Sequence, residues 1–71
     1  MKYIYSNYRR NDSFINLENV VAITPLAFPS SNEWIIRFVS SGETIDWTYE
    51  NVKDRDNEFK TIKKLIAEVV L

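Results

Sequence analysis

Residues 34–49, WIIRFVSSGETIDWTY, form the stretch that decides the fold. Two runs of alternating apolar residues flank Ser41 and Gly42, and Gly42 is the one glycine in the chain. Successive side chains of a strand point to opposite faces of a sheet, and glycine readily adopts the backbone conformations of tight turns. The stretch therefore predicts a β-hairpin with arms over about residues 34–40 and 43–49.

The two arms have one favourable register. When Ser40 pairs with Glu43 across the turn, one face of the hairpin becomes a ladder of large apolar side chains. The opposite face then pairs Arg37 with Asp46. A shift of one residue would mix the two faces, so the pattern specifies this register. The ladder consists of three pairs: Trp34 with Tyr49, Ile36 with Trp47 and Phe38 with Ile45.

Three shorter strand patterns precede the hairpin. Residues 2–8, 14–17 and 20–26 combine β-branched and aromatic residues with the alternation that is typical of strands. Pro25 has no backbone amide hydrogen, so we expect the third strand to end there or to lie at a sheet edge. The following residues 27–33 contain proline and serines and are expected to form a loop.

The last part of the chain carries a helical pattern over about residues 57–70. Its apolar residues recur at the 3, 4 and 7 spacing of one helix face, and we expect Asp54 or Asp56 to cap its N-terminus. Lysines occupy the other face and are expected to be a solvated surface. They are Lys60, Lys63 and Lys64.

The order of these elements predicts an α+β fold. We expect an antiparallel meander of four to five strands, with one C-terminal helix packed on one face against the apolar ladder. The second face of such a sheet is open. We expect it to carry Ile35 and Val39, with either Ile4 and Tyr8 or Tyr3 and Tyr5 nearby, and to be covered by a partner or a second copy.

Composition limits the possible functions. The 71 residues correspond to one domain, and the chain contains neither Cys nor His, which excludes disulfides and the usual zinc sites within it. A domain of this size is marginally stable alone, so we expect a homo-oligomer. The net charge of −1 disfavours strongly electrostatic binding to nucleic acids or membranes. Without a secretory signal or a long apolar run, we expect a cytoplasmic protein.

The residue types also disfavour catalysis. Without His or Cys, the chain lacks the usual general base and the strongest nucleophile, so we expect neither an enzyme nor a cofactor. Asp54, Asp56 and Glu58 could hold a Mg²⁺ or Ca²⁺ ion. Capping of the helix explains these acids more simply, and we expect no metal site.

The arginines and tyrosines suggest an alternative function, which is binding of a small anionic ligand. Guanidinium groups bind phosphate through paired hydrogen bonds, and aromatic rings stack on bases. Such a site, formed between subunits, would make the protein an oligomeric sponge for a nucleotide. The candidate ligand-binding residues are Tyr3, Tyr5, Tyr8, Arg9, Arg10 and Arg37.

Single-stranded nucleic acid is the third hypothesis. A sheet that displays aromatic side chains beside basic groups is the arrangement of single-strand binders. The residues that fit it are Trp34, Trp47, Tyr49 and Arg37. The alternation, however, places both tryptophans on the face that the helix covers, and the net charge is slightly negative.

The segment of residues 14–20, FINLENV, is followed by a hairpin that ends in Ile45-Asp46-Trp47 and by a terminal helix. This order resembles a class of small bacterial and phage proteins with a sheet like that of pleckstrin-homology domains. The chain lacks a basic loop for lipid headgroups, so the resemblance does not imply phosphoinositide binding. It implies a protein that binds and blocks a partner.

Our leading hypothesis is therefore a small non-catalytic interaction module of bacterial or phage origin. We expect it to self-associate through an open sheet face or an edge strand. It would act on a protein partner as an inhibitor, by binding, blocking or sequestering it.

Overall fold

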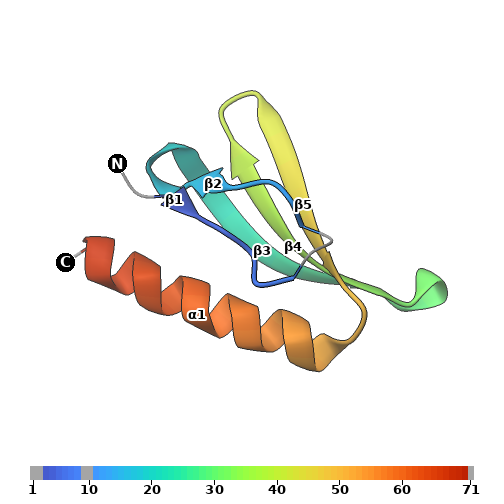
Figure 1. Cartoon of the computed structure of the whole chain (residues 1–71). Coiled ribbons are helices and arrows are strands. Elements are labelled where there is room, and N and C mark those ends of the chain that lie inside the picture. Colours follow the sequence, from blue (N-terminus) through green and yellow to red (C-terminus); the bar gives the residue numbers. More distant parts are fainter. Residues whose placement is uncertain (1–2, 9–10, 71) are drawn as a thin grey trace.

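The computed structural model describes residues 3–8 and 11–70, with side chains up to residue 66. It confirms the α+β fold: antiparallel strands come first, and one C-terminal helix follows (Figure 1). The five strands form two sheets instead of one continuous meander. In the described part of the chain, no helix is long and apolar enough to cross a membrane.

The larger sheet has three strands in the order β3-β4-β5. They are β3 (Val20–Phe28), β4 (Glu33–Ser40) and β5 (Glu43–Tyr49). The predicted hairpin register is confirmed at every pair, from Trp34 with Tyr49 to Ser40 with Glu43. Gly42 has a φ of 88°, a conformation that glycine adopts without steric cost.

The smaller sheet pairs β1 (Tyr3–Ile4) with β2 (Ile15–Asn16). Both strands are shorter than the predicted ranges 2–8 and 14–17. β1 ends early because its continuation bonds to the helix: the Ser6 hydroxyl and the Asn7 backbone amide donate to the carboxylate of Glu58, at 2.5 and 2.9 Å. After β2, a short 3₁₀ turn, Leu17–Asn19, leads into β3.

The predicted loop over residues 27–33 is shorter in the structure. β3 continues to Phe28, and a 3₁₀ turn over Pro29–Ser31 then leads to β4. Asn32 has a φ of 54°, in the left-handed region that asparagine tolerates better than most residues. Pro25 lies inside β3, which is an edge strand of its sheet, as its missing amide hydrogen requires.

The helix α1 (Val52–Val70) begins five residues before the predicted start at 57. Asp54 or Asp56 was expected to cap it, and this prediction is wrong. The side chain of Asn51 accepts a hydrogen bond from the Asp54 amide at 2.8 Å and so satisfies a free donor of the first turn. The first turns carry few apolar residues, so periodicity alone could not place the start.

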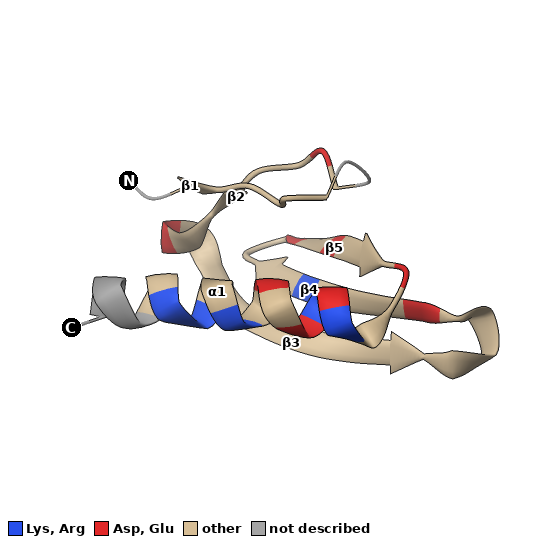
Figure 2. Cartoon of the chain, turned by 60° about the horizontal axis from the view of Figure 1, so that its bottom comes forward, with Lys and Arg blue, Asp and Glu red and all other residues tan. Residues whose placement is uncertain are grey.

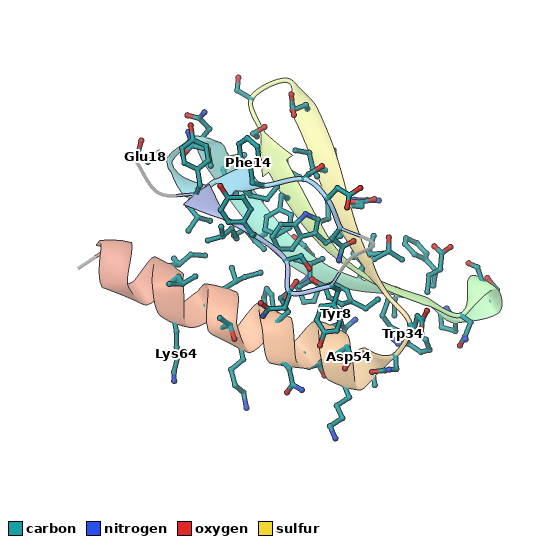
Figure 3. All side chains as sticks on the ribbon, viewed as in Figure 1. Tyr8, Phe14, Glu18, Trp34, Asp54 and Lys64 are labelled. Atoms are coloured by element: carbon teal, nitrogen blue, oxygen red, sulfur yellow. The ribbon has the colours of Figure 1, made fainter. Side chains whose placement is uncertain are left out.

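The core lies on one face of the three-stranded sheet, where α1 and the β1-β2 pair both cover the hairpin's apolar ladder (Figures 1 and 3). Trp47 and Phe38 are 1% and 2% exposed, and their rings meet edge to face with centroids 4.7 Å apart. Trp34 is only half-buried. The other buried apolar side chains of this cluster are Ile4, Ile15, Ile36, Tyr49 and Ile62.

The second face of the sheet differs from our expectation. Ile4 and Tyr8 pack on the covered face, Tyr8 against Tyr49, so neither contributes to an open apolar surface. On the second face, Arg37 makes two hydrogen bonds to the Asp46 carboxylate, at 2.9 and 3.0 Å. Ile35 is buried despite its place on this face. The register also places Leu26 and Phe28 on this face, and Phe28 is 41% exposed. The face therefore combines an ion pair with a few apolar side chains.

Candidate functional site

A groove of about 360 Å³ lies between the first half of β3 and residues 59–66 of α1. We call it the β3–α1 groove. It is mostly apolar, and among the described side chains that line it only Lys63 is charged. The groove is lined by Leu17, Val20, Val21, Ala22, Ile23, Phe59, Lys63 and Ile66.

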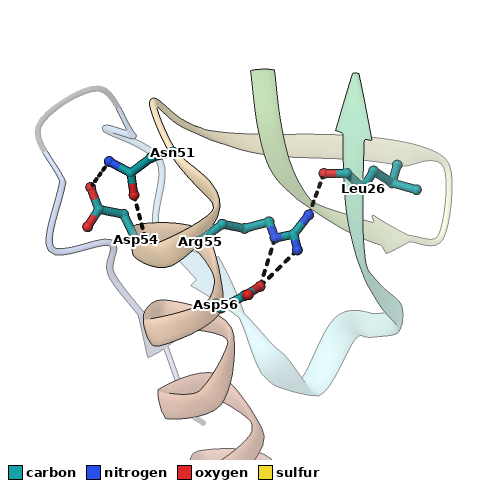
Figure 4. A network of polar contacts seen from close by, with 5 residues as sticks. All are labelled: Leu26, Asn51, Asp54, Arg55 and Asp56. Carbon is teal, nitrogen blue, oxygen red and sulfur yellow. Dashed lines mark hydrogen bonds and ion pairs between the residues drawn. The ribbon is translucent and has the colours of Figure 1, made fainter. Parts of the chain in front are cut away.

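The edge of β3 beside this groove is only partly protected. Over its second half, Pro25 offers no amide hydrogen. Arg55 of α1 donates to the Leu26 carbonyl at 2.9 Å, which joins the helix to this half of β3 (Figure 4). The first half contains a register irregularity between Val20 and Ala22, which leaves the side chain of Val21 75% exposed. An apolar side chain that points into water at the rim of an apolar groove is typical of a contact surface.

The opposite edge of the sheet is closed at one point. Asn11 forms two hydrogen bonds with the backbone of Thr48 in β5, so its side chain takes the place of a neighbouring strand there. Of the two edges, the first half of β3 is therefore the better candidate for contact with another chain.

Positive charge gathers on the exposed side of the second half of α1. Lys60, Lys63 and Lys64 line a second hollow of about 380 Å³ together with Phe59 and Asp56. The Lys63 ammonium lies 5.5 Å from the centre of the Phe59 ring, and both residues also line the β3–α1 groove. Figure 2 shows mixed charges on the first half of α1 and only basic residues on the described part of its second half. The apolar groove thus borders a basic surface.

The acids at the start of α1 have different main partners, although Asp54 and Glu58 both lie near Tyr8. Asp54 contacts Asn51, and Asp56 accepts two hydrogen bonds from Arg55, at 2.8 and 3.1 Å (Figure 4). Glu58 is buried and faces the N-terminal segment. Within residues 3–8 and 11–66, no group of three acidic side chains is placed to hold a metal ion.

Glu58 forms the centre of a buried polar network. Its carboxylate accepts hydrogen bonds from Ser6, from the Asn7 amide and from the Tyr49 hydroxyl, the last at 2.5 Å. Burial, the hydrogen bond to Glu58 and its negative charge raise the pKa of Tyr49 well above its usual range. Burial and the carboxylates of Asp54 and Glu58 raise the pKa of Tyr8 as well. This network joins the N-terminal segment to the helix, and its three donors use both carboxylate oxygens of Glu58.

The predicted ligand-binding residues lie in different environments. Tyr3 and Tyr5 contact the ring of Phe14 on the small sheet, with centroids 5.4 and 5.7 Å apart. Tyr8 packs on Tyr49 near two carboxylates, where a phosphate would be repelled. Arg37 is paired with Asp46. Arg9 and Arg10 lie outside the described residues.

Sequence reasoning missed the β3–α1 groove and interpreted its lysines as a solvated helix surface. One signal was available. Residues 20–23, VVAI, are consecutive apolar residues in a strand that Pro25 assigns to an edge, and they carry no charge to discourage pairing. The aromatic contact between Tyr3, Tyr5 and Phe14 was also not predicted, because it joins residues of two strands whose pairing was unknown.

Comparison of the chain with protein-family models, with curated proteins and with solved structures gives no match. The candidate site is therefore interpreted from its own geometry.

Proposed function

We propose that this chain is a small non-catalytic module that binds another protein through the β3–α1 groove. The observation that carries the proposal is the exposed Val21 at the rim of an apolar groove, on a strand edge that Pro25 interrupts in its other half. Strand edges and neighbouring apolar grooves are a common way to bind an extended segment. We place this activity in the cytoplasm, and binding would block or sequester the partner.

The chemistry of the described side chains supports a binding role over catalysis. The one buried carboxylate, Glu58, already accepts three hydrogen bonds, so it has little capacity left to act as a general base. Trp47 is buried and Trp34 half-buried, so the tryptophans offer no open platform for stacking bases. A folded module that presents one apolar groove fits a protein partner better.

Affinity capture with matched variants tests this proposal. Val21→Asp places a charge at the rim of the groove, and it should abolish capture of a partner from the native host without unfolding, because Val21 is 75% exposed. Thr44→Asp makes a similar change at an exposed position of β5, paired with Val39 outside the groove, and should leave capture unchanged. If both variants capture the same proteins as the original chain, the groove is not the binding surface.

Sedimentation of the same three proteins addresses self-association. If the original chain is monomeric at high micromolar concentration, its groove is free to bind a different protein, as we propose. A dimer that Val21→Asp dissociates and Thr44→Asp does not would assign the groove to a second copy of this chain and overturn our choice of partner.

A further inference from the structure

We infer that the segment bound in the β3–α1 groove is acidic: an apolar side chain enters the groove, and neighbouring carboxylates contact Lys60, Lys63 and Lys64. This inference rests on the proposed function and adds the chemistry of the partner. It follows from three observations on the charges around the groove.

The first observation is the position of the lysines. Residues three and four apart are neighbours on a helix surface, so Lys60 lies beside both Lys63 and Lys64. All three side chains are exposed, and within the described part of the chain no carboxylate lies within ion-pair distance of them. Figure 3 shows Lys64 pointing away from the sheet into solvent. Three like charges on one patch repel each other, and a partner with carboxylates would relieve this repulsion.

The second observation is that one residue links charge and groove. Lys63 lines both the apolar groove and the basic hollow, and its side chain lies against Phe59, which also lines both. A carboxylate that contacts Lys63 would therefore be within a few residues of an apolar side chain in the groove. The surface fits a segment in which acidic and apolar residues are close in sequence.

The third observation concerns a second copy of the chain. In a two-fold dimer, each residue near the axis meets its own counterpart. A two-fold dimer that joins the grooves of two copies would contain the same basic surface, Lys60, Lys63 and Lys64, on both sides of the contact. Such like-charge contacts oppose association. An acidic partner meets no such repulsion, and the aliphatic lining of the groove suits an apolar side chain better than a nucleic-acid base.

A titration followed by NMR tests the inference on the full chain. The probes are blocked nine-residue peptides with a central Val-Ile pair flanked by glutamates, by serines or by lysines, and a short oligothymidylate. We expect the glutamate peptide to shift the backbone amides of residues 20–23 and 60–64 and to bind about tenfold more tightly than the serine peptide. Three exposed ion pairs account for a difference of this size.

Charge reversal supplies the matched variants. The triple variant Lys60→Glu, Lys63→Glu, Lys64→Glu should prefer the lysine peptide to the glutamate peptide, which reverses the order seen with the original chain. Lys53→Glu makes the same change at an exposed position of the first helical turn and should keep the original order. The NMR spectrum of each variant shows whether it is folded. Tighter binding of the lysine peptide by the triple variant would be a new binding activity, which an unfolded protein cannot show.

The outcomes separate the two proposals. Equal affinity for the glutamate and serine peptides, lost in Val21→Asp, would overturn the acidic partner and leave the groove as a protein-binding site. Stronger binding of oligothymidylate than of the glutamate peptide, at the same lysines, would overturn the acidic partner in favour of a nucleic acid. No shift at residues 20–23 with any probe, together with unchanged capture by Val21→Asp, would overturn both proposals.

Discussion

The side-chain amide of Asn11 forms hydrogen bonds with both backbone groups of Thr48. The Thr48 amide donates to Asn11 Oδ1 at 2.8 Å, and Asn11 Nδ2 donates to the Thr48 carbonyl at 3.2 Å. An amide side chain offers the same donor and acceptor as a peptide group, so one residue can satisfy a strand edge without a second strand. The N-terminal loop is thereby fixed to β5.

Replacing Asn11 with alanine should destabilise the domain. Three partly buried hydrogen bonds are lost, because Asn11 Nδ2 also donates to the Ser6 hydroxyl at 3.2 Å. At about 0.5–1.5 kcal/mol each, we expect a loss of roughly 1.5–4.5 kcal/mol in the free energy of unfolding. Urea denaturation measures this loss, and hydrogen exchange at the Thr48 amide should become faster. Asn19→Ala, at an exposed asparagine in the turn before β3, is the control and should change stability little. Equal stability of both variants would show that the loop is not fixed by Asn11.

Tyr49 should make the domain sensitive to alkaline pH. Its pKa in the folded state is raised above the ordinary value of 10.0, so the unfolded chain loses the phenol proton first and rising pH favours unfolding. Above pH 10, the stability of the original chain should fall by about 1.4 kcal/mol per pH unit more steeply than that of Tyr49→Phe. Urea denaturation at a series of pH values compares the two proteins. Tyr8 is present in both, so parallel pH profiles would contradict the role given to Tyr49.

Glu58→Gln should be strongly destabilising although it changes only one atom of the side chain. A carboxylate can accept all three donors, whereas the amide group of glutamine would turn its own hydrogens toward some of them. Hydrogen bonds to charged groups contribute about 1.5–3 kcal/mol each, so we expect a loss of at least that size in thermal or urea denaturation. Asp56→Asn, at an exposed residue of the same helix, is the matched control. A loss as small as the control's would mean that the network tolerates a neutral side chain.

Trp47 should tolerate phenylalanine much better than alanine. The indole nitrogen is buried and has no hydrogen-bond partner among the described residues, so its removal sacrifices no hydrogen bond. Trp47→Ala leaves a cavity beside Phe38 and should cost roughly 3–5 kcal/mol, which is most of the stability of a small domain. Trp47→Phe should cost clearly less in the same denaturation experiment. Equal losses in the two variants would indicate that the indole nitrogen has a partner in solution.

The parts of the fold that sequence predicts are those encoded locally. The register from Ser40 to Glu43 follows from alternation within one hairpin, and the structure has every predicted pair. The separation of β1 and β2 into a second sheet could not be predicted in this way. It depends on Ser6 and Asn11, which bond to Glu58 and Thr48 far along the chain.

The sequence predicted the separate elements of the candidate site but not that they lie together. Pro25 identified an edge strand, and periodicity identified the lysine face of the helix, but nothing in the sequence places these two features side by side. Their contact results from how α1 lies across the sheet, with Ile62 buried in the core and Phe59 at the margin of the groove. The side chain of Val21 is exposed because the strand register is irregular at this point, and no pattern in the sequence predicts this irregularity.

The hydrogen bonds from Ser6 and Asn7 to Glu58 set an order of events during synthesis. A ribosome makes the N-terminal segment well before it makes the residue that binds this segment, and the β3-β4-β5 meander lies between them in the chain. The hairpin pairs residues that are close in the chain, whereas the first residues can bond to Glu58 only when the helix is present. Until then, the inner face of the sheet lacks the helix that helps to cover it, and exposed apolar surface of this kind promotes aggregation.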